Sequence, residues 1–300
     1  MDKVVELIDI VKDYGSFRAV DGLQLDIYKG DVFGFLGPNG AGKSTTIRML
    51  TTLIRPTSGT INLFGMDLKT HPMKILSRMG SIVEKPDFYV NLSARKNLKL
   101  FAMISGKRIS QKRIDEVLEL TGLSGRSNDK VKAYSHGMKQ RLGIAQALLH
   151  EPELIILDEP TTGLDPQGIV DIRHLIQQLT SEKKITVFLS SHLLSEIELI
   201  ATRMAVINKG KCIAQGTVGE LLNKEDSVIT IQCSEPEKAA NLIGQKFQLN
   251  VSIYKDFIET SAPASLVHLM VKDLVYNGIA IEDVSARKRL ENIYLQLTQN

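Results

Sequence analysis

The sequence has few of the features that mark secreted, metal-binding or membrane-spanning proteins. Its two cysteines, Cys212 and Cys233, are too few for a disulfide framework and too far apart for a metal motif. No run approaches the roughly 18 apolar residues that a spanning helix needs. The first residues carry no basic region followed by an apolar stretch, so we expect no signal peptide and a cytoplasmic chain. Any role at a membrane would then require a partner.

An excess of one charge sign is also missing. The formal net charge is +3, from 37 basic and 34 acidic residues that are interspersed along the chain. The nearest approach to a basic cluster, at residues 107–108 and 112–113, is typical of a solvated helix edge. We therefore expect no nucleic-acid partner. A hydrophobic content of 43% in 300 residues is enough for a sizeable core and more than one domain.

Strand and helix patterns alternate over residues 1–222, which predicts an α/β fold with a largely parallel sheet. We expect strands at 4–10, 23–27, 32–36, 59–64, 154–157, 185–190 and 204–207, and helices at 44–53 and 167–180. From about residue 90 to residue 150 the apolar spacing is helical instead. This stretch is predicted to be a helical insertion in the α/β domain.

A polar stretch at 222–227 separates this domain from a second one at 227–300. Its pattern predicts a βαββαβα order, with elements at 228–233, 236–246, 247–253, 257–261, 264–275, 280–284 and 289–297. That order resembles a small ferredoxin-like sandwich with one added helix. We therefore expect a C-terminal α+β accessory domain.

A glycine-rich loop is the most informative segment of the chain. Its nine residues are Gly37, Pro38, Asn39, Gly40, Ala41, Gly42, Lys43, Ser44 and Thr45. The glycines let successive backbone N–H groups point at phosphates, and the following helix adds its dipole. A lysine placed as Lys43 reaches the β- and γ-phosphates, and a hydroxyl placed as Ser44 ligates Mg²⁺. The loop follows a predicted strand and opens a predicted helix, so it predicts a nucleoside triphosphate ligand rather than a surface turn.

Two adjacent carboxylates, Asp158 and Glu159, end the apolar run 154–157. Two charges at a buried strand end are unfavourable unless a cation compensates them. Beside a phosphate-binding loop, we expect Asp158 to hold Mg²⁺ and Glu159 to polarise the attacking water as general base. A helix-capping acidic pair is the structural alternative.

Three further segments complete a recognisable set. Residues 134–141 read YSHGMKQR and open a helix, with Ser135 as N-cap and Gly137 allowing close approach of an anion. Residues 163–165, GLD, follow the two acids, and residues 190–192, SSH, close the next predicted strand. With these segments in this order, the chain resembles an ABC-type ATPase over residues 1 to about 220.

The resemblance implies a role for each segment. Tyr14 matches the aromatic residue that stacks on adenine, and His192 matches the residue that contacts the γ-phosphate and orients the water. Ser135 and Gly137 match the signature that grips the γ-phosphate of a second copy, and Asp165 matches the loop that crosses the dimer seam. ATP, Mg²⁺, an ATP-sandwich dimer and integral membrane permease subunits are thereby implied. Such a chain would be peripheral, on the cytoplasmic face of the membrane.

Two departures from the family pattern narrow the branch. Glu84 stands where glutamine is usual, and a carboxylate accepts hydrogen bonds but donates none. We expect Glu84 to act in catalysis and to face Mg²⁺, so that three carboxylates with coupled protonation crowd one metal. His136 stands where the signature usually has glycine. With the C-terminal extension, these features resemble the ATPases of bacterial antimicrobial peptide exporters, of the bacitracin-resistance and lantibiotic self-immunity type.

The implied function is ATP hydrolysis that powers a separate permease and exports antimicrobial peptides for immunity or resistance. An exporter of lipid, sodium or small drugs with the same ATPase architecture is an alternative. A soluble ABC protein acting on ribosomes or DNA is the alternative from another class. Such proteins carry two cassettes or a long heptad coiled coil, whereas this chain has one cassette and no sustained heptads.

The loop at 86–92 allows two interpretations. Phe88 and Tyr89 could anchor a cytoplasmic helix of the permease, or they could pack against the core of this chain.

Overall fold

The computed structural model describes residues 2–222, 226–288 and 294. The chain divides into two compact units, Met1–Gly216 and Thr217–Asn300. This division lies a few residues before the polar stretch at 222–227 in which the sequence places the boundary. The helix expected at 289–297 lies outside the described residues, except for Tyr294.

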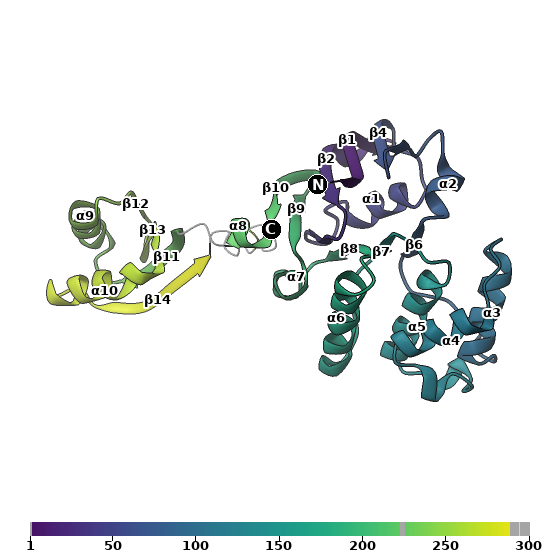
Figure 1. The fold of residues 1–300 in the computed structure, drawn as a ribbon. Coiled ribbons are helices and arrows are strands. Elements are labelled where there is room, and N and C mark those ends of the chain that lie inside the picture. The colour runs from purple at the N-terminus through teal and green to yellow at the C-terminus, as the bar shows by residue number, and fades with distance from the viewer. Residues whose placement is uncertain (1, 223–225, 289–293, 295–300) are drawn as a thin grey trace. The chain divides into compact units, whose positions relative to one another are not determined.

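A six-stranded sheet in the order β10-β9-β3-β8-β7-β6 forms the centre of the first unit (Figure 1). Its strands are β3 (Val32–Leu36), β6 (Met79–Ile82), β7 (Leu154–Leu157), β8 (Thr186–Ser191), β9 (Arg203–Asn208) and β10 (Lys211–Thr217). Neighbouring strands from β9 to β6 run parallel. All residues of β3, β7 and β8 are buried, because parallel strands are covered on both faces. The predicted α/β fold is confirmed.

Each of the three central strands leads into a helix. These helices are α1 (Lys43–Leu50) after β3, α6 (Pro166–Ser181) after β7, and α7 (Leu194–Ile200) after β8. Because the strands are parallel and adjacent, their carboxyl ends lie at one edge of the sheet, where ligands bind in open α/β folds. The phosphate-binding loop, the two acids and His192 all belong to this edge.

A second, antiparallel sheet covers part of the first unit. Its order is β2-β1-β4-β5, with β1 (Lys3–Tyr14), β2 (Phe17–Tyr28), β4 (Ser58–Leu63) and β5 (Met66–Asp67). Apolar residues of this sheet, of α1 and of the central sheet form one continuous core, which includes Leu25, Leu63, Ile47, Phe33 and Phe188. The loop that precedes α1 therefore rests on packed elements on either side.

The helical insertion consists of α3 (Ala94–Ile104), α4 (Gln111–Leu120) and α5 (His136–Leu148), which pack on one another (Figure 1). Two short turns, η1 (Ser124–Arg126) and η2 (Val131–Ala133), join α4 to α5, and α2 (Pro72–Leu76) precedes β6. Each of the three long helices begins at a serine whose side chain accepts a backbone N–H, as N-caps do. Close backbone packing joins α5 to β6, since a Cβ added to Gly80 would lie 2.3 Å from the Ala147 carbonyl oxygen.

The second unit begins with α8 (Val218–Leu222) and contains an antiparallel sheet in the order β12-β13-β11-β14. Its elements are β11 (Asp226–Cys233), α9 (Pro236–Phe247), β12 (Val251–Ile253), β13 (Phe257–Pro263), η3 (Ala264–Leu266), α10 (Val267–Tyr276) and β14 (Ile281–Lys288). The βαββαβ order is that of a ferredoxin-like motif. The strand expected at 247–253 begins only at Val251, because Phe247 ends α9 and Gln248 caps it with a left-handed φ of 54°.

Candidate active site

The loop between β3 and α1 has the backbone shape of a phosphate cradle. Gly40 and Gly42 adopt φ values of 79° and 105°, which favour glycine. A Cβ at Gly42 would also lie 2.7 Å from the Ala19 carbonyl oxygen. Lys43 is 5% exposed, and its Nζ donates to the carbonyl oxygens of Gly37 at 2.7 Å and Pro38 at 3.2 Å. The ammonium is thus fixed inside the loop, where it can meet an anion bound by backbone N–H groups.

The side chain of Glu159, which follows β7, contacts residues that follow the two neighbouring strands β3 and β8. One carboxylate oxygen, Oε1, lies 3.4 Å from Lys43 Nζ, and the other, Oε2, lies 3.1 Å from His192 Nδ1. Oε2 also accepts a hydrogen bond from Thr162 Oγ1 at 3.0 Å. The structure therefore brings together three residues that the sequence marked separately as loop lysine, general base and γ-phosphate contact.

The ionisation of Glu159 follows from these contacts. Burial raises the pKa of Glu159, but the hydrogen bond from Thr162 and the electrostatic influence of Lys43 and His192 outweigh it. The pKa of this carboxyl is therefore held below its usual value. A carboxylate that is ionised at neutral pH can accept a hydrogen bond from a water molecule, as a general base must.

Asp158 and the backbone of Glu159 both bond to Ser190, a serine for which the sequence predicted no role. Ser190 is fully buried at the end of β8, and its Oγ donates to Asp158 Oδ1 at 2.7 Å. The same Oγ accepts the backbone N–H of Glu159 at 2.8 Å. Ser190 and Thr162 are the two functional neighbours that were missed. Two consecutive hydroxyl residues at the buried end of β8, Ser190 and Ser191, are the signal that could have revealed this role.

Glu84 does not lie with the other two carboxylates. Its carboxylate forms an ion pair with Arg48 of α1, and its side chain is 63% exposed. Within residues 2–222, 226–288 and 294, no group of three or more His, Cys, Asp or Glu side chains could hold a metal ion. In this structure Arg48 supplies the positive charge that Glu84 meets, so the expected crowding of three carboxylates around one metal is not seen and stays a prediction.

The remaining oxygen donors suit magnesium. Ser44 begins the first turn of α1 beside Lys43, and Asp158 is only 7% exposed with one carboxylate oxygen bonded to Ser190. Mg²⁺ prefers oxygen ligands and binds through one or two carboxylates while it keeps several waters. A hydroxyl and a single buried carboxylate fit that preference better than three carboxylates would.

Four other predicted site residues have local contacts. Ser135 caps α5 and accepts the Met138 N–H at 3.2 Å, and Asp165 caps α6 and accepts the Gly168 N–H at 3.1 Å. A Cβ at Gly137 would approach only Leu164, at 3.8 Å, so this helix start is open. Tyr14 ends β1 with its side chain 46% exposed. No hydrogen bond found among the described residues joins these four to Lys43 or Glu159.

The two aromatic residues at 88–89 have different environments. Phe88 is buried and packs edge-on against Phe101, with ring centroids 6.2 Å apart. Tyr89 is 60% exposed. Packing on the core of this chain thus accounts for Phe88, whereas Tyr89 presents its ring at the surface.

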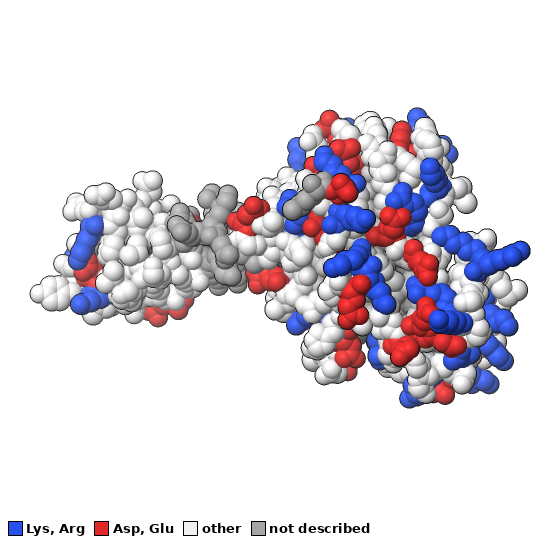
Figure 2. Space-filling model, viewed as in Figure 1, with Lys and Arg blue, Asp and Glu red and all other residues white. Residues whose placement is uncertain are grey.

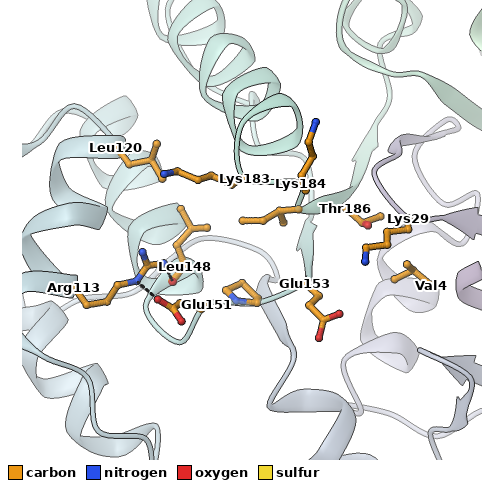
Figure 3. Close-up of a pocket in the computed structure, with 12 residues that line it drawn as sticks. Val4, Lys29, Arg113, Leu120, Leu148, Glu151, Glu153, Lys183, Lys184 and Thr186 are labelled. Carbon is orange, nitrogen blue, oxygen red and sulfur yellow. Dashed lines mark hydrogen bonds and ion pairs between the residues drawn. The ribbon is translucent and has the colours of Figure 1, made fainter. Parts of the chain in front are cut away.

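A separate pocket of about 520 Å³ lies where β7 and β8 begin, away from the carboxyl ends of these strands (Figure 3). Lys29, Lys183 and Lys184 contribute basic side chains to its lining. Arg113 bonds to the Leu148 carbonyl oxygen at 2.7 Å and lies 3.9 Å from Glu151. The pocket shares no residue with the phosphate-binding loop or the two acids, so it is not the nucleotide site.

Charges of both signs alternate on the face of the first unit shown in Figure 2. Exposed pairs such as Arg78 with Glu153, at 2.6 Å, account for part of this mixture. Among the helices in the described part of the chain, none is both long and apolar enough to cross a bilayer.

The chain is similar to transporter ATP-binding proteins over nearly its whole length. The ABC transporter family model matches residues 20–162. The chain is 43% identical to the bacitracin transport ATP-binding protein BcrA of Bacillus licheniformis, over 99% of this chain and 98% of that protein. It is 34% identical to the daunorubicin resistance ATP-binding protein DrrA3 of Streptomyces coeruleorubidus, over 99% and 96%.

The fold comparison agrees with the sequence comparison. The structure of CbiO1 from Clostridium perfringens, part of the ABC transporter complex CbiONQ, matches with a TM-score of 0.69 at 25% identity. The match covers 83% of this chain and 97% of that one. The predicted likeness to the bacitracin-resistance type is thus confirmed, and the chain belongs to the ABC transporter family as an ATP-binding, ATP-hydrolysing subunit.

Proposed function

We propose that two copies of this chain close around two ATP molecules and power a separate membrane permease that exports an antimicrobial peptide of the bacitracin type. The observation that carries the proposal is the 43% identity to the bacitracin transport ATP-binding protein over nearly all of both chains. The similarity includes the second unit as well as the nucleotide site. ATP would bind the closed dimer more tightly than the open one, and this difference in affinity would change the state of the permease.

The first part of the mechanism is capture of the triphosphate. The loop backbone and the start of α1 bind the phosphates, and Lys43 releases its bonds to the Gly37 and Pro38 carbonyls to meet them. The exposed ring of Tyr14 stacks on the adenine. These contacts would account for affinity toward ATP.

The second part is hydrolysis. Glu159, kept ionised by its neighbours, orients the attacking water, and His192 lies beside the same carboxylate oxygen. Ser44 and Asp158 would hold Mg²⁺, which neutralises charge on the β- and γ-phosphate oxygens when bound. Ser190 keeps Asp158 and the Glu159 backbone in fixed relative positions.

The second copy completes the site. Ser135 and Gly137 lie at an open helix start, which is a ready-made anion site. In the proposed pair they cover the γ-phosphate held by Lys43 of the partner copy, and the 163–165 loop with Asp165 crosses the seam. The permease, with Tyr89 as one exposed contact, would hold the pair at the cytoplasmic face of the membrane.

The paired site can be tested with Glu159→Gln. A glutamine amide cannot take a proton from the attacking water. ATP should therefore bind without being hydrolysed, and the closed dimer should accumulate. Size-exclusion chromatography with light scattering should show a dimer with ATP and Mg²⁺ and a monomer without nucleotide. The double variant Glu159→Gln with Lys43→Ala is the control and should stay monomeric. A monomer under every condition would show that the paired-site mechanism is wrong.

The cargo can be tested by susceptibility. Cells that express this chain with its permease should resist bacitracin more than cells carrying the Glu159→Gln variant. Lantibiotics and daunorubicin belong in the same panel, because the relative DrrA3 makes small drugs the second candidate. Resistance to daunorubicin alone would replace the peptide by a small drug.

A further inference from the structure

His136, the unusual residue of the signature, makes a contact within its own chain. Its Nε2 lies 3.2 Å from the carbonyl oxygen of Thr162. A Cβ built on Gly163 would lie 3.5 Å from the same nitrogen, so the imidazole ring rests on the 162–163 backbone. A carbonyl oxygen only accepts, so Nε2 carries the proton and donates it. Glycine at this position, as in the usual signature, could make no such bond.

The residue that accepts this bond also contacts the general base. Thr162 Oγ1 donates to Glu159 Oε2 at 3.0 Å, and the Thr162 backbone N–H donates to the Glu159 carbonyl oxygen at 3.2 Å. Thr162 is therefore bonded at its carbonyl to α5 and at its amide and hydroxyl to Glu159. A shift of His136 relative to β7 would move the hydroxyl that fixes the base.

The start of α5 thus has two sets of contacts. Ser135 and Gly137 lie at the open helix start that the proposed function assigns to the partner's ATP. His136, between them, is bonded to the turn that carries the base of its own site. A Cβ added at Gly137 would lie 3.8 Å from Leu164 of the same turn, so the turn passes beside the helix start without closing it.

We propose that His136 is a positioning residue for hydrolysis, which holds Glu159 of its own chain through Thr162. In the proposed pair, the start of α5 covers the ATP bound by the partner copy, whereas Glu159 acts on the ATP bound by its own copy. His136 would therefore connect the two sites. This inference rests on the proposed paired site. His136 touches neither ATP nor water in this role. Its loss should lower kcat and leave the KM for ATP unchanged.

The first experiment compares variants of the full chain. His136→Ala should lower kcat roughly three- to tenfold, the range expected for one net hydrogen bond. His136→Gln retains an N–H donor at a similar reach and should restore kcat to within about twofold. His174→Ala, an exposed histidine on α6, is the matched control and should behave as wild type. A loss that His136→Gln does not restore, or a change in KM alone, would overturn the proposal.

Mixed dimers with two affinity tags separate the two copies. The reference dimer carries Glu159→Gln in one copy, so only the other copy has a working base. When His136→Ala is placed in the copy with the working base, the rate should fall three- to tenfold below the reference. When His136→Ala is placed in the copy with Glu159→Gln, the working base keeps its own histidine and the rate should equal the reference.

Three results of the mixed-dimer experiment would overturn the positioning role of His136. A loss only in the second arrangement would place His136 on the partner's ATP, and equal losses in both would indicate general damage; either result overturns the positioning role. So would no loss in either. Failure of the reference dimer to form with ATP would instead overturn the proposed function, and the positioning role would fall with it.

Discussion

Glu159 shows how single residues acquire their chemistry in this chain. Its carboxylate meets an ammonium, an imidazole and a hydroxyl from three different segments, and each of them favours the charged form. Burial alone would have raised its pKa. The ionisation of Glu159 therefore depends more on its neighbouring side chains than on its position at the end of β7.

Thr162→Val should reveal the hydroxyl's share of this effect. The hydrogen bond stabilises ionised Glu159 and lowers its pKa, so removing the hydroxyl should raise that pKa. The acidic limb of the kcat/KM profile should move to higher pH, with the greatest loss of rate at low pH. Thr180→Val, the same change in α6 away from the site, is the control. An unmoved acidic limb would mean that Thr162 does not tune the base.

The contacts of some site residues could be predicted from the sequence, and those of others could not. Lys43, Glu159 and His192 were predicted from motif spacing, and the structure brings them into contact. Glu84 was expected beside the metal, but it pairs with Arg48, which lies 36 positions earlier. No local pattern reports such a pairing, because it depends on how α1 lies against the end of β6.

At the scale of elements, periodicity located the buried strands and the principal helices. β3 and β7 have the predicted bounds, because fully apolar runs between turn residues leave little choice. Short or exposed elements such as β10 and α7 were missed. β10 has a single buried position, and α7 is only seven residues long, which is too short for its apolar spacing to stand out.

Gly80→Ala tests the packing of β6 on α5. The added Cβ would lie 2.3 Å from the Ala147 carbonyl oxygen, so the helix backbone must move. We expect a loss of about 1–3 kcal/mol in the free energy of unfolding, as in other overpacked cores. Chemical denaturation measures it.

Gly125→Ala is the matched control for that variant. No atom lies within 4 Å of its added Cβ, and its φ is not left-handed. It should leave the free energy of unfolding unchanged or slightly raised. Equal stability of Gly80→Ala and wild type would mean that β6 and α5 are not in such close contact.

At the scale of the molecule, the two units have separate cores. One core joins the antiparallel sheet, α1 and the central sheet, and the other lies between the second unit's sheet and its helices. All of the predicted nucleotide-site residues belong to Met1–Gly216. The second unit is therefore not needed to build the phosphate cradle or to place the acids.

Deleting the residues after 222 should leave ATP binding intact. The Kd for a fluorescent ATP analogue should stay within about twofold of the full chain, because distant, independent sites add within a few tenths of a kcal/mol. Cooperative thermal unfolding of the fragment checks that it is folded. A folded fragment that binds no ATP would show that the second unit takes part in the nucleotide site.

The sequence by itself determined the ligand, the fold class and the family. Glycine spacing, an apolar strand and adjacent acids are local features, and the chemistry of phosphate binding depends on them directly. Only the tertiary structure decided the partners of those residues. Arg48 pairs with Glu84, Ser190 bonds to both Asp158 and the Glu159 backbone, and His136 bonds to Thr162. Such contacts join elements far apart in the chain, and only packing sets the distances between them.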